Sequence, residues 1–440
     1  MNLLLYTSQA TPRVRYACKV LFGHILGLQV EVTADWSYFQ SGNADKIIYG
    51  AAGSVGKEPR LPASSLLFEK GIHPQRVEIR HFKGRPAGFF VPGKANAMLP
   101  FDLLAFTFYL AARYEEYLPF EGDAHGRFPA TGSLAHQHGF LQQPVLQEWG
   151  AVLLKRLQAF YPHLPDRRPG YTFRPTYDVD MGWAYLHRPL WLQLGGWLRA
   201  ALQGNHTLLR ERLRVCLGRA QDPFYTFDEL ERLHIELELR PLFFLLLGQF
   251  GPYDKNLPPK GRAMQALTQK LITFSDTGLH PSYRSNTSRA QLQAEVEHYT
   301  RLTGQAPLRS RQHFLKLSFP ATYRQLIQAG IQEDYTMGYA DAPGFRAGLS
   351  VPYPWYDLEV EAEQPLLIYP FAVMDVTLQQ YLKLPPGQAI EMLKGLIDTV
   401  RGTGGVFMPL WHNSSFAASH GWAGWAEVHE QLLRYGSTKS

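Results

Sequence analysis

The stretch FRPTYDVDMGWAY, residues 173–185, places two carboxylates at the end of an apolar and aromatic run. Such a run favours a buried strand, and in a strand residues i and i+2 point to the same face. Asp178 and Asp180 would therefore lie side by side at the strand tip. Because paired carboxylates repel unless a cation lies between them, we favour a cation site over two helix-capping aspartates.

The composition of the chain indicates a folded globular protein. Its 440 residues exceed one ordinary compact domain, and 45% are hydrophobic, 19% charged and 13% aromatic. The net charge of +6 is spread along the sequence, apart from short clusters such as LLRERLRVCLGR (208–219). These clusters are typical of a solvated helix face, so no nucleic-acid partner is predicted.

The cysteines, the first residues and the length of the apolar runs predict where the protein is located. Cys18 and Cys216 are the two cysteines, and neither has metal-ligand spacing, which favours a reducing compartment. The start, MNLLLYTSQA, resembles a first strand more than a signal peptide, and no run approaches the length of a membrane helix. We therefore expect a soluble cytoplasmic protein, which disfavours mature cell-wall polymers as substrates.

Residues 1–165 are predicted to form a smaller mixed α/β domain of unknown role. A strand over 2–8 precedes a helix with Thr11 as N-cap and Pro12 at its first position. Two further apolar helices are expected over 101–118 and 145–161. The Pro-rich and charged stretch PHLPDRRPG (162–170) indicates the end of this domain.

The pattern changes over residues 170–440, where strands and helices alternate. Seven strands are expected, at 171–178, 241–248, 277–282, 307–314, 330–336, 366–373 and 405–412. Alternation of this kind predicts parallel βα units, in either an incomplete barrel or an open sheet.

Ionisable residues stand at the ends of most of these strands. Parallel βα folds place their chemistry at the carboxyl ends of the strands. In chain order these ends carry Asp178 and Asp180, His280, Arg309, Arg311, His313, Asp334, Asp375 and His412. One concave polar site built from several strands accounts for this distribution.

Several of these motifs resemble those of the polysaccharide deacetylases of the NodB-homology type, carbohydrate esterase family 4. The resemblance is carried by TYDVD (176–180), GLHPSYRS (278–285), RSRQHF (309–314) and PLWHN (409–413). It implies a distorted seven-stranded (β/α) barrel that uses a divalent metal to remove acetyl groups from sugars. The N-terminal stretches RYEEYLP and DAHGRFPA resemble an uncharacterised domain that precedes such deacetylases.

The resemblance implies a metal site at the strand ends. Asp180 and His280 would be metal ligands and Asp178 the general base. A metal held by Asp and His lowers the pKa of a water toward neutrality, and the preference of zinc for imidazole favours that metal. A second carboxylate within reach then takes the proton of that water.

One position departs from the motifs of that family. The second motif usually carries another His four residues after the first, and that position is Arg284. A guanidinium cannot bind a metal. We expect His313 to supply the missing ligand; otherwise the site keeps two protein ligands, or has lost its metal.

The remaining motifs imply residues for proton transfer. Arg311 matches the arginine that pairs with the catalytic base, and His412 matches the general acid that protonates the departing amine. Asp375, at the end of the preceding strand, suits a carboxylate that orients His412. The sequence therefore predicts a metal-dependent hydrolase of an N-acetylated sugar or cell-envelope glycan precursor. The alternative is a catalytically degenerate barrel that binds a glycan or a partner protein.

Overall fold

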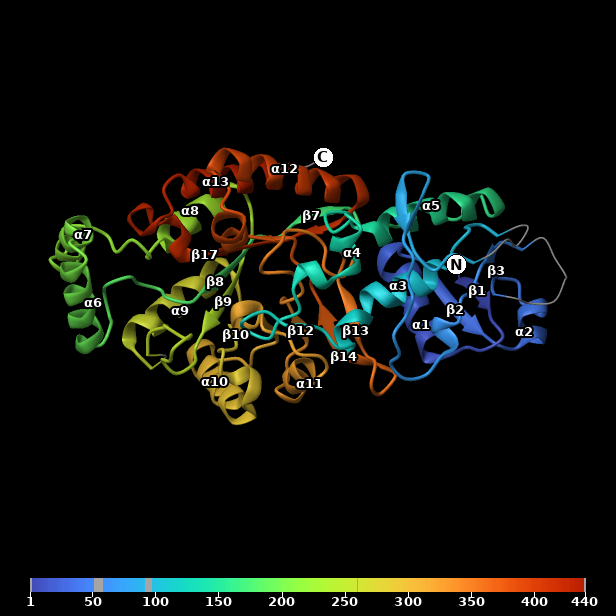
Figure 1. Ribbon diagram of the computed structural model, residues 1–440, viewed down its shortest axis with the longest axis horizontal. Coiled ribbons are helices and arrows are strands. Elements are labelled where there is room, and N and C mark those ends of the chain that lie inside the picture. The colour runs from blue at the N-terminus through green and yellow to red at the C-terminus, as the bar shows by residue number, and fades with distance from the viewer. Residues whose placement is uncertain (1, 51–57, 92–96, 259, 439–440) are drawn as a thin grey trace.

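The first sheet of the protein is formed by the N-terminal residues. Figure 1 shows a computed structural model, which describes residues 2–50, 58–91, 97–258 and 260–438. Four parallel strands lie in the order β2-β1-β3-β4. Their bounds are β1 (Asn2–Tyr6), β2 (Gln29–Thr33), β3 (Asp45–Tyr49) and β4 (Arg60–Leu61).

Helices and one hairpin complete this part of the chain. They are α1 (Pro12–Cys18), α2 (Trp36–Ser41), α3 (Leu103–Ala111), α4 (Leu134–Gln137), α5 (Val145–Phe160) and the hairpin of β5 (Arg80–Phe82) with β6 (Arg85–Ala87). The predicted cap of α1 is confirmed, because the Thr11 side chain accepts a hydrogen bond from the backbone of Val14. The helix predicted over 101–118 ends earlier than expected, where Arg113 adopts a left-handed conformation with φ of 53°.

A nine-stranded sheet forms the larger part of the molecule, in the order β13-β14-β12-β11-β10-β9-β8-β17-β15. All neighbours in it are parallel except β13 and β14. The bounds are β8 (Thr176–Val179), β9 (Leu242–Leu246), β10 (Asp276–His280), β11 (Arg309–Ser310), β12 (Glu333–Asp334), β13 (Tyr353–Asp357), β14 (Ala362–Ile368), β15 (Val373–Met374) and β17 (Pro409–His412). A separate parallel pair joins β7 (Tyr171–Phe173) to β16 (Gly405–Phe407).

Helices connect these strands, as parallel pairing requires. They are α6 (Leu190–Leu202), α7 (His206–Cys216), α8 (Phe227–Glu236), α9 (Arg262–Phe274), α10 (Arg289–Thr303), α11 (Ala321–Gln328), α12 (Pro386–Thr403) and α13 (Trp425–Ser437). Every residue of β9, sequence LFFLL, is buried, because such a strand is covered on both faces. Within the described residues, no helix has the length and apolar content needed to cross a bilayer.

The mixed α/β class is confirmed, but the predicted distorted seven-stranded (β/α) barrel is not: the described residues form a nine-stranded sheet whose ladder does not close on itself. Three predicted strands are each divided in two, and the breaks lie at or beside Pro175, Pro370 and Pro409. Proline lacks the N–H that a strand ladder needs. The run predicted as one strand over 366–373 pairs with β12 through β14 and with β17 through β15. Residues 369–372 therefore link β14 to β15 at the other end of the strand order, and no ladder joins these two strands among the described residues.

The two parts of the chain share one hydrophobic core. A single cluster of buried side chains includes Leu5 and Leu104 from the N-terminal part and Tyr177 and Leu393 from the C-terminal part. The Tyr16 hydroxyl donates a hydrogen bond of 2.8 Å to the carbonyl of Pro354. This shared core holds the N-terminal part against the edge of the larger sheet.

Candidate metal centre

The two aspartates of the opening stretch lie at the end of β8, as the sequence predicts. Neighbouring strands are in register there, with Asp178 opposite His412 of β17 and Phe244 of β9. Asp178 and Asp180 both line a cavity of about 370 Å³. The carboxyl ends of the parallel strands meet at this cavity, because every strand in that part of the sheet runs the same way.

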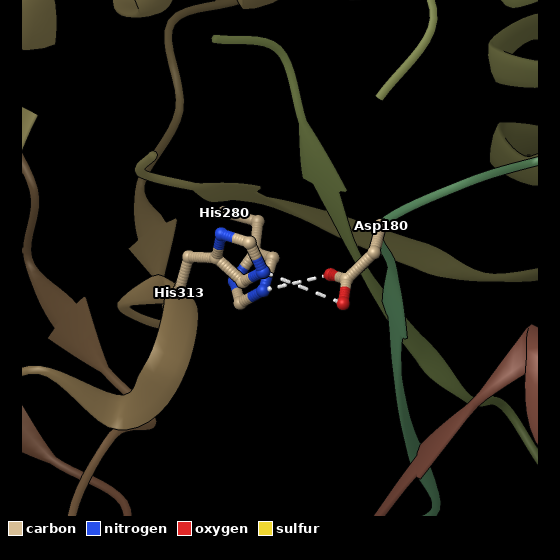
Figure 2. A group of neighbouring side chains, drawn as sticks. All are labelled: Asp180, His280 and His313. Atoms are coloured by element: carbon tan, nitrogen blue, oxygen red, sulfur yellow. Dashed lines mark ion pairs between the residues drawn. The ribbon is translucent and has the colours of Figure 1, made fainter. Parts of the chain in front are cut away.

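Asp180 faces two imidazoles, His280 from the end of β10 and His313 from the turn after β11 (Figure 2). The Oδ1 atom of Asp180 lies 3.2 Å from Nε2 of His280, and its Oδ2 atom lies 3.4 Å from Nε2 of His313. Ligand atoms of the three residues all lie within 4.8 Å of one another. The turn after β11 thus brings His313 beside the pair from the neighbouring strands.

The far nitrogen of each imidazole is held by a hydrogen bond. His280 donates from Nδ1 to the carbonyl of Arg311 at 2.5 Å, and His313 donates from Nδ1 to the carboxylate of Asp254 at 2.8 Å. Each ring thus turns Nε2 toward Asp180, and in the neutral form that donates from Nδ1 this atom carries the lone pair that a metal binds. Carboxylates and carbonyls behind metal-binding histidines orient the ring in this way.

The residues fit a divalent metal such as zinc. Oδ1 of Asp180 and Nε2 of His280 are buried and lack a hydrogen-bond partner, although they are close, because the pair is not aligned as a donor and an acceptor. Buried polar atoms without partners are rare. In a tetrahedral zinc site with ligand distances of about 2.0–2.1 Å, neighbouring ligand atoms are about 3.3 Å apart. The two contacts of Asp180 are of that length, one from each carboxylate oxygen, and with one ligand atom per residue the three atoms lie within 4.8 Å of one another.

The electrostatics of this group favour positive charge between the three side chains. Burial opposes the charge of Asp180, but the charge of His313 and the approach of both imidazoles lower its pKa well below the usual value. Burial also opposes protonation of His313, yet the carboxylates of Asp180 and Asp254 raise its pKa to about 9. The same negative charges would stabilise a bound cation.

Asp178 is held by the buried guanidinium of Arg311. Nη1 of Arg311 donates to Oδ1 of Asp178 at 2.9 Å, and its other nitrogens donate to the Thr176 hydroxyl and the Tyr335 carbonyl. Oδ2 of Asp178 lies 3.6 Å from Nε2 of His280. One oxygen of Asp178 is therefore fixed by Arg311, while the other lies on the side of the imidazole.

His412 lines the same cavity from the end of β17, beside Asp178, and is held by Asp375. Its Nδ1 donates to Asp375 at 2.8 Å, and its backbone N–H donates to the same carboxylate at 2.7 Å. Nε2 of His412 is 3.9 Å from Oδ2 of Asp180. Although burial opposes protonation, the carboxylates of Asp375, Asp180 and Asp178 raise the pKa of His412 to about 10.

The structure thus brings together all seven residues singled out in the sequence. Asp178, Asp180, His280, His313 and His412 line the cavity, and Arg311 and Asp375 bond to two of them from behind. Arg284 is exposed and lies outside the cavity lining. Two other strand-end residues also lie elsewhere: Arg309 pairs with Glu333, and Asp334 binds the hydroxyls of Ser310 and Thr336.

Sequence reasoning missed Asp254, which holds His313. This carboxylate lies in the long loop after β9 rather than at the strand end, so the strand-end criterion passes over it. It is buried and also accepts a hydrogen bond of 2.9 Å from the backbone of Tyr283.

The N-terminal part also contributes to the cavity through Arg127, another residue that sequence reasoning missed. Arg127 donates to the Phe314 carbonyl at 2.7 Å and to the Tyr381 hydroxyl at 3.1 Å, and it pairs with Asp123. Phe314 and Leu315 both have positive φ, at 59° and 53°, in the turn that carries His313. The sequence feature that could have pointed to Arg127 is the stretch DAHGRFPA (123–130), which contains both Asp123 and Arg127.

Comparison with protein families gives a match for the N-terminal part. Residues 3–162 match a family described as "Family of unknown function (DUF7033)". No curated protein matches the sequence.

Comparison with solved structures finds similarity to several polysaccharide deacetylases. One is a provisionally assigned deacetylase of Mycobacterium smegmatis, 16% identical with a TM-score of 0.39 over 62% of this chain and 85% of that chain. A probable deacetylase of Pseudomonas aeruginosa PAO1 is 13% identical, with a TM-score of 0.37 over 60% of this chain and 84% of that chain. A deacetylase of Bacillus cereus is 9% identical, with a TM-score of 0.30 over 60% of this chain and 85% of that chain.

Proposed function

We propose that the protein is a metal-dependent hydrolase that removes an acetyl group from an N-acetylated sugar or cell-envelope glycan precursor. The observation that carries this proposal is the convergence of Asp180, His280 and His313 in one cavity that Asp178 and His412 also line. The carbohydrate substrate is inferred from the resemblance of the sequence motifs.

Asp180, His280 and His313 would hold the metal. A divalent ion such as zinc, when bound there, supplies a Lewis acid that lowers the pKa of a water and polarises an acyl oxygen. The chain itself provides the base: Asp178 takes the proton of the attacking water. The charge of Arg311 and its bond to Oδ1 keep this carboxylate oriented, because the guanidinium cannot lose its own proton.

His412 would donate a proton to the nitrogen of the departing amine. The Asp375 carboxylate fixes Nδ1 of His412 as a donor and so directs Nε2 into the cavity. Three apolar side chains, Leu315, Met374 and Val376, line the same cavity and suit the methyl group of an acetyl substrate. The proton taken by Asp178 and the proton given by His412 balance the hydrolysis of one amide bond.

A catalytically degenerate barrel that binds a glycan or a partner is the competing function, and it rests on Arg284. Its support weakens because Arg284 is exposed and His313 lies beside Asp180 instead. Metal binding and hydrolysis separate the two functions.

The first experiment is the metal content of purified protein after loading with zinc and dialysis. About one equivalent is expected in the wild type and in Arg284→Ala, and loss of that equivalent is expected in Asp180→Ala and His313→Ala. An unloaded wild type would remove the basis of the proposal. If His313→Ala retained its zinc while Asp180→Ala lost it, His313 would not be a ligand.

The second experiment measures acetate release from oligomers of N-acetylglucosamine by the zinc-loaded protein. Asp178→Asn should keep its zinc and lose about 10²- to 10⁴-fold in rate, because only the base is removed. A protein that holds zinc and binds these oligomers without releasing acetate would support the degenerate barrel.

A further inference from the structure

The helices α6 and α7 form a hairpin that stands apart from both sheets. In Figure 1 this hairpin lies at the left end of the molecule, on the connection between β8 and α8. The only buried residue of α6 is Ala200, and the only buried residue of α7 is Val215. The hairpin therefore contributes little to the core of the protein.

An apolar stripe runs the length of α6 on its exposed side. Leu190, Leu194, Leu198 and Leu202 recur at four-residue intervals and are 78%, 68%, 62% and 80% exposed, and Trp191 beside them is 63% exposed. Residues at that spacing lie on one face of a helix. A contiguous apolar face of this kind marks an interaction surface, whereas single exposed leucines do not.

The hairpin is also strongly basic. Residues 186–220 contain six arginines and one acidic residue, Glu211. Arg199, Arg210, Arg214 and Arg219 are exposed and have no ion-pair partner among the described residues. Glu211 is engaged within the protein by the Tyr185 hydroxyl at 2.7 Å. The surface thus combines an apolar stripe with unpaired positive charge.

This combination selects the kind of partner. An amphipathic helix with arginines beside leucines and tryptophan binds at the surface of an anionic bilayer. A second copy of the same hairpin would place arginines against arginines, which repel. The 13 residues of α6 span about 20 Å, less than the roughly 30 Å of a bilayer core. The helix would therefore lie along the membrane surface.

The apolar stripe leads toward the candidate metal centre. The Trp191 ring lies edge-on against Phe250, with centroids 5.6 Å apart. Phe250 and Tyr253 are 41% and 45% exposed and belong to the same loop as Asp254, which holds His313. Tyr253 stacks on Tyr283 at 4.2 Å. The hairpin thus contacts the loop that carries Asp254.

We propose that the α6–α7 hairpin docks the protein on the surface of an anionic lipid bilayer, with the stripe of α6 in the headgroup region. The docking needs neither the metal nor the hydrolysis proposed above and goes beyond them. Its consequence is that a membrane-bound protein would hold the cavity near the bilayer, where a lipid-carried glycan is within reach.

The test is flotation of the full-length protein with two kinds of vesicle. One contains phosphatidylcholine alone, and the other also contains about 30% phosphatidylglycerol, which makes it anionic. Wild type is expected to bind the anionic vesicles, and Leu194→Glu with Leu198→Glu should weaken that binding by about tenfold or more. Arg210→Glu with Arg214→Glu should weaken it comparably and reduce its salt dependence. The matched control is Ile235→Glu with Val360→Glu, two apolar residues that are 65% and 56% exposed outside the hairpin.

The outcomes decide the proposal. Binding of wild type and control, with loss in both hairpin variants at unchanged melting temperature, supports it. Absence of wild-type binding, equal binding to neutral vesicles, or unchanged binding of the leucine variant overturns it. A wild-type dimer that the leucine variant dissociates, without vesicle binding, would assign the stripe to a second copy of this chain. None of these readouts depends on zinc or acetate release, so failure here is distinct from failure of the proposed hydrolase.

Discussion

At the scale of single residues, the candidate metal centre depends on side chains that do not reach the metal. Asp254 holds His313, the Arg311 carbonyl holds His280, and Asp375 holds His412. Each imidazole therefore has a fixed orientation before any ligand binds. Such outer hydrogen bonds raise ligand basicity and reduce the entropy lost on binding.

The first prediction concerns Asp254. Its replacement by Ala should weaken zinc binding by about 10- to 100-fold, because the ring of His313 loses its orienting carboxylate. Asp254→Asn should weaken it less, since the amide oxygen still accepts the bond from Nδ1. Competition with a chelator measures both affinities. Equal affinity in wild type and Asp254→Ala would show that His313 needs no such support.

The second prediction concerns His412 and Asp375. His412→Gln should retain zinc, because Nε2 of His412 lies outside the ligand group, while acetate release should fall by about 10²- to 10⁴-fold. The rate of acetate release should also fall in Asp375→Asn, by a smaller factor. Zinc content and rate are measured on the same samples. Loss of zinc in His412→Gln would instead make this histidine a ligand.

At the scale of elements, β8 is fastened to α8 and α13 by a buried polar contact. The Tyr177 hydroxyl lies 3.1 Å from Nε2 of His234 and 2.7 Å from Nε2 of His429. His234 also donates from Nδ1 to the Leu230 carbonyl. Burial lowers the pKa of His234 to about 4 and lowers that of His429 well below its usual value. Both rings are therefore neutral in the folded protein.

The third prediction is the pH dependence that follows. An unfolded histidine has a pKa of about 6.5, so below that pH the unfolded chain takes up a proton that folded His234 takes up only near pH 4. The free energy of unfolding of wild type should therefore fall, relative to His234→Gln, by about 1.4 kcal/mol per pH unit below pH 6.5. Urea unfolding of both proteins at pH 8, 6 and 5 measures this difference. A difference that stays constant from pH 8 to pH 5 would contradict it.

At the scale of the whole molecule, buried ion pairs join the two parts of the chain. Glu116 accepts hydrogen bonds from Arg113 of its own part and from Arg346 of the larger part, at 2.7 and 2.9 Å. Arg13 pairs with Glu361 in the same way. From these contacts and the shared core we expect the two predicted domains, residues 1–165 and 170–440, to unfold together.

The fourth prediction tests that coupling. Glu116→Gln should lower the free energy of unfolding by about 3–5 kcal/mol, because buried Arg346 loses its counter-charge while Arg113 keeps only its pair with Glu115. Glu78→Gln is the matched control, since its pair with Arg80 is exposed on both sides and solvent screening leaves it little effect on stability. Circular dichroism and tryptophan fluorescence should report one coincident transition in wild type. Two separated transitions would show that the parts fold independently.

The fold was predictable where the determining interactions are local. The alternation of apolar strands and helices, the Thr11 cap and the helix over 145–161 all follow from short-range periodicity and capping. That the sheet stays open between β14 and β15 was not predictable, because it depends on which distant strand each half of residues 366–373 meets. The strand β13 and the exposed stripe of α6 were missed for a related reason, since burial is set by neighbours far away in sequence.

The sequence by itself determined which side chains stand at the strand ends and in what order, because parallel strands of known direction bring their carboxyl ends to one edge. That was enough to collect Asp178, Asp180, His280 and His412. Only the tertiary structure decided that Arg284 points to solvent, that His313 approaches Asp180, and that Asp254 and Arg127 support this arrangement. Those contacts are made by loops from separate parts of the chain, whose conformations are set by the packing of the whole molecule.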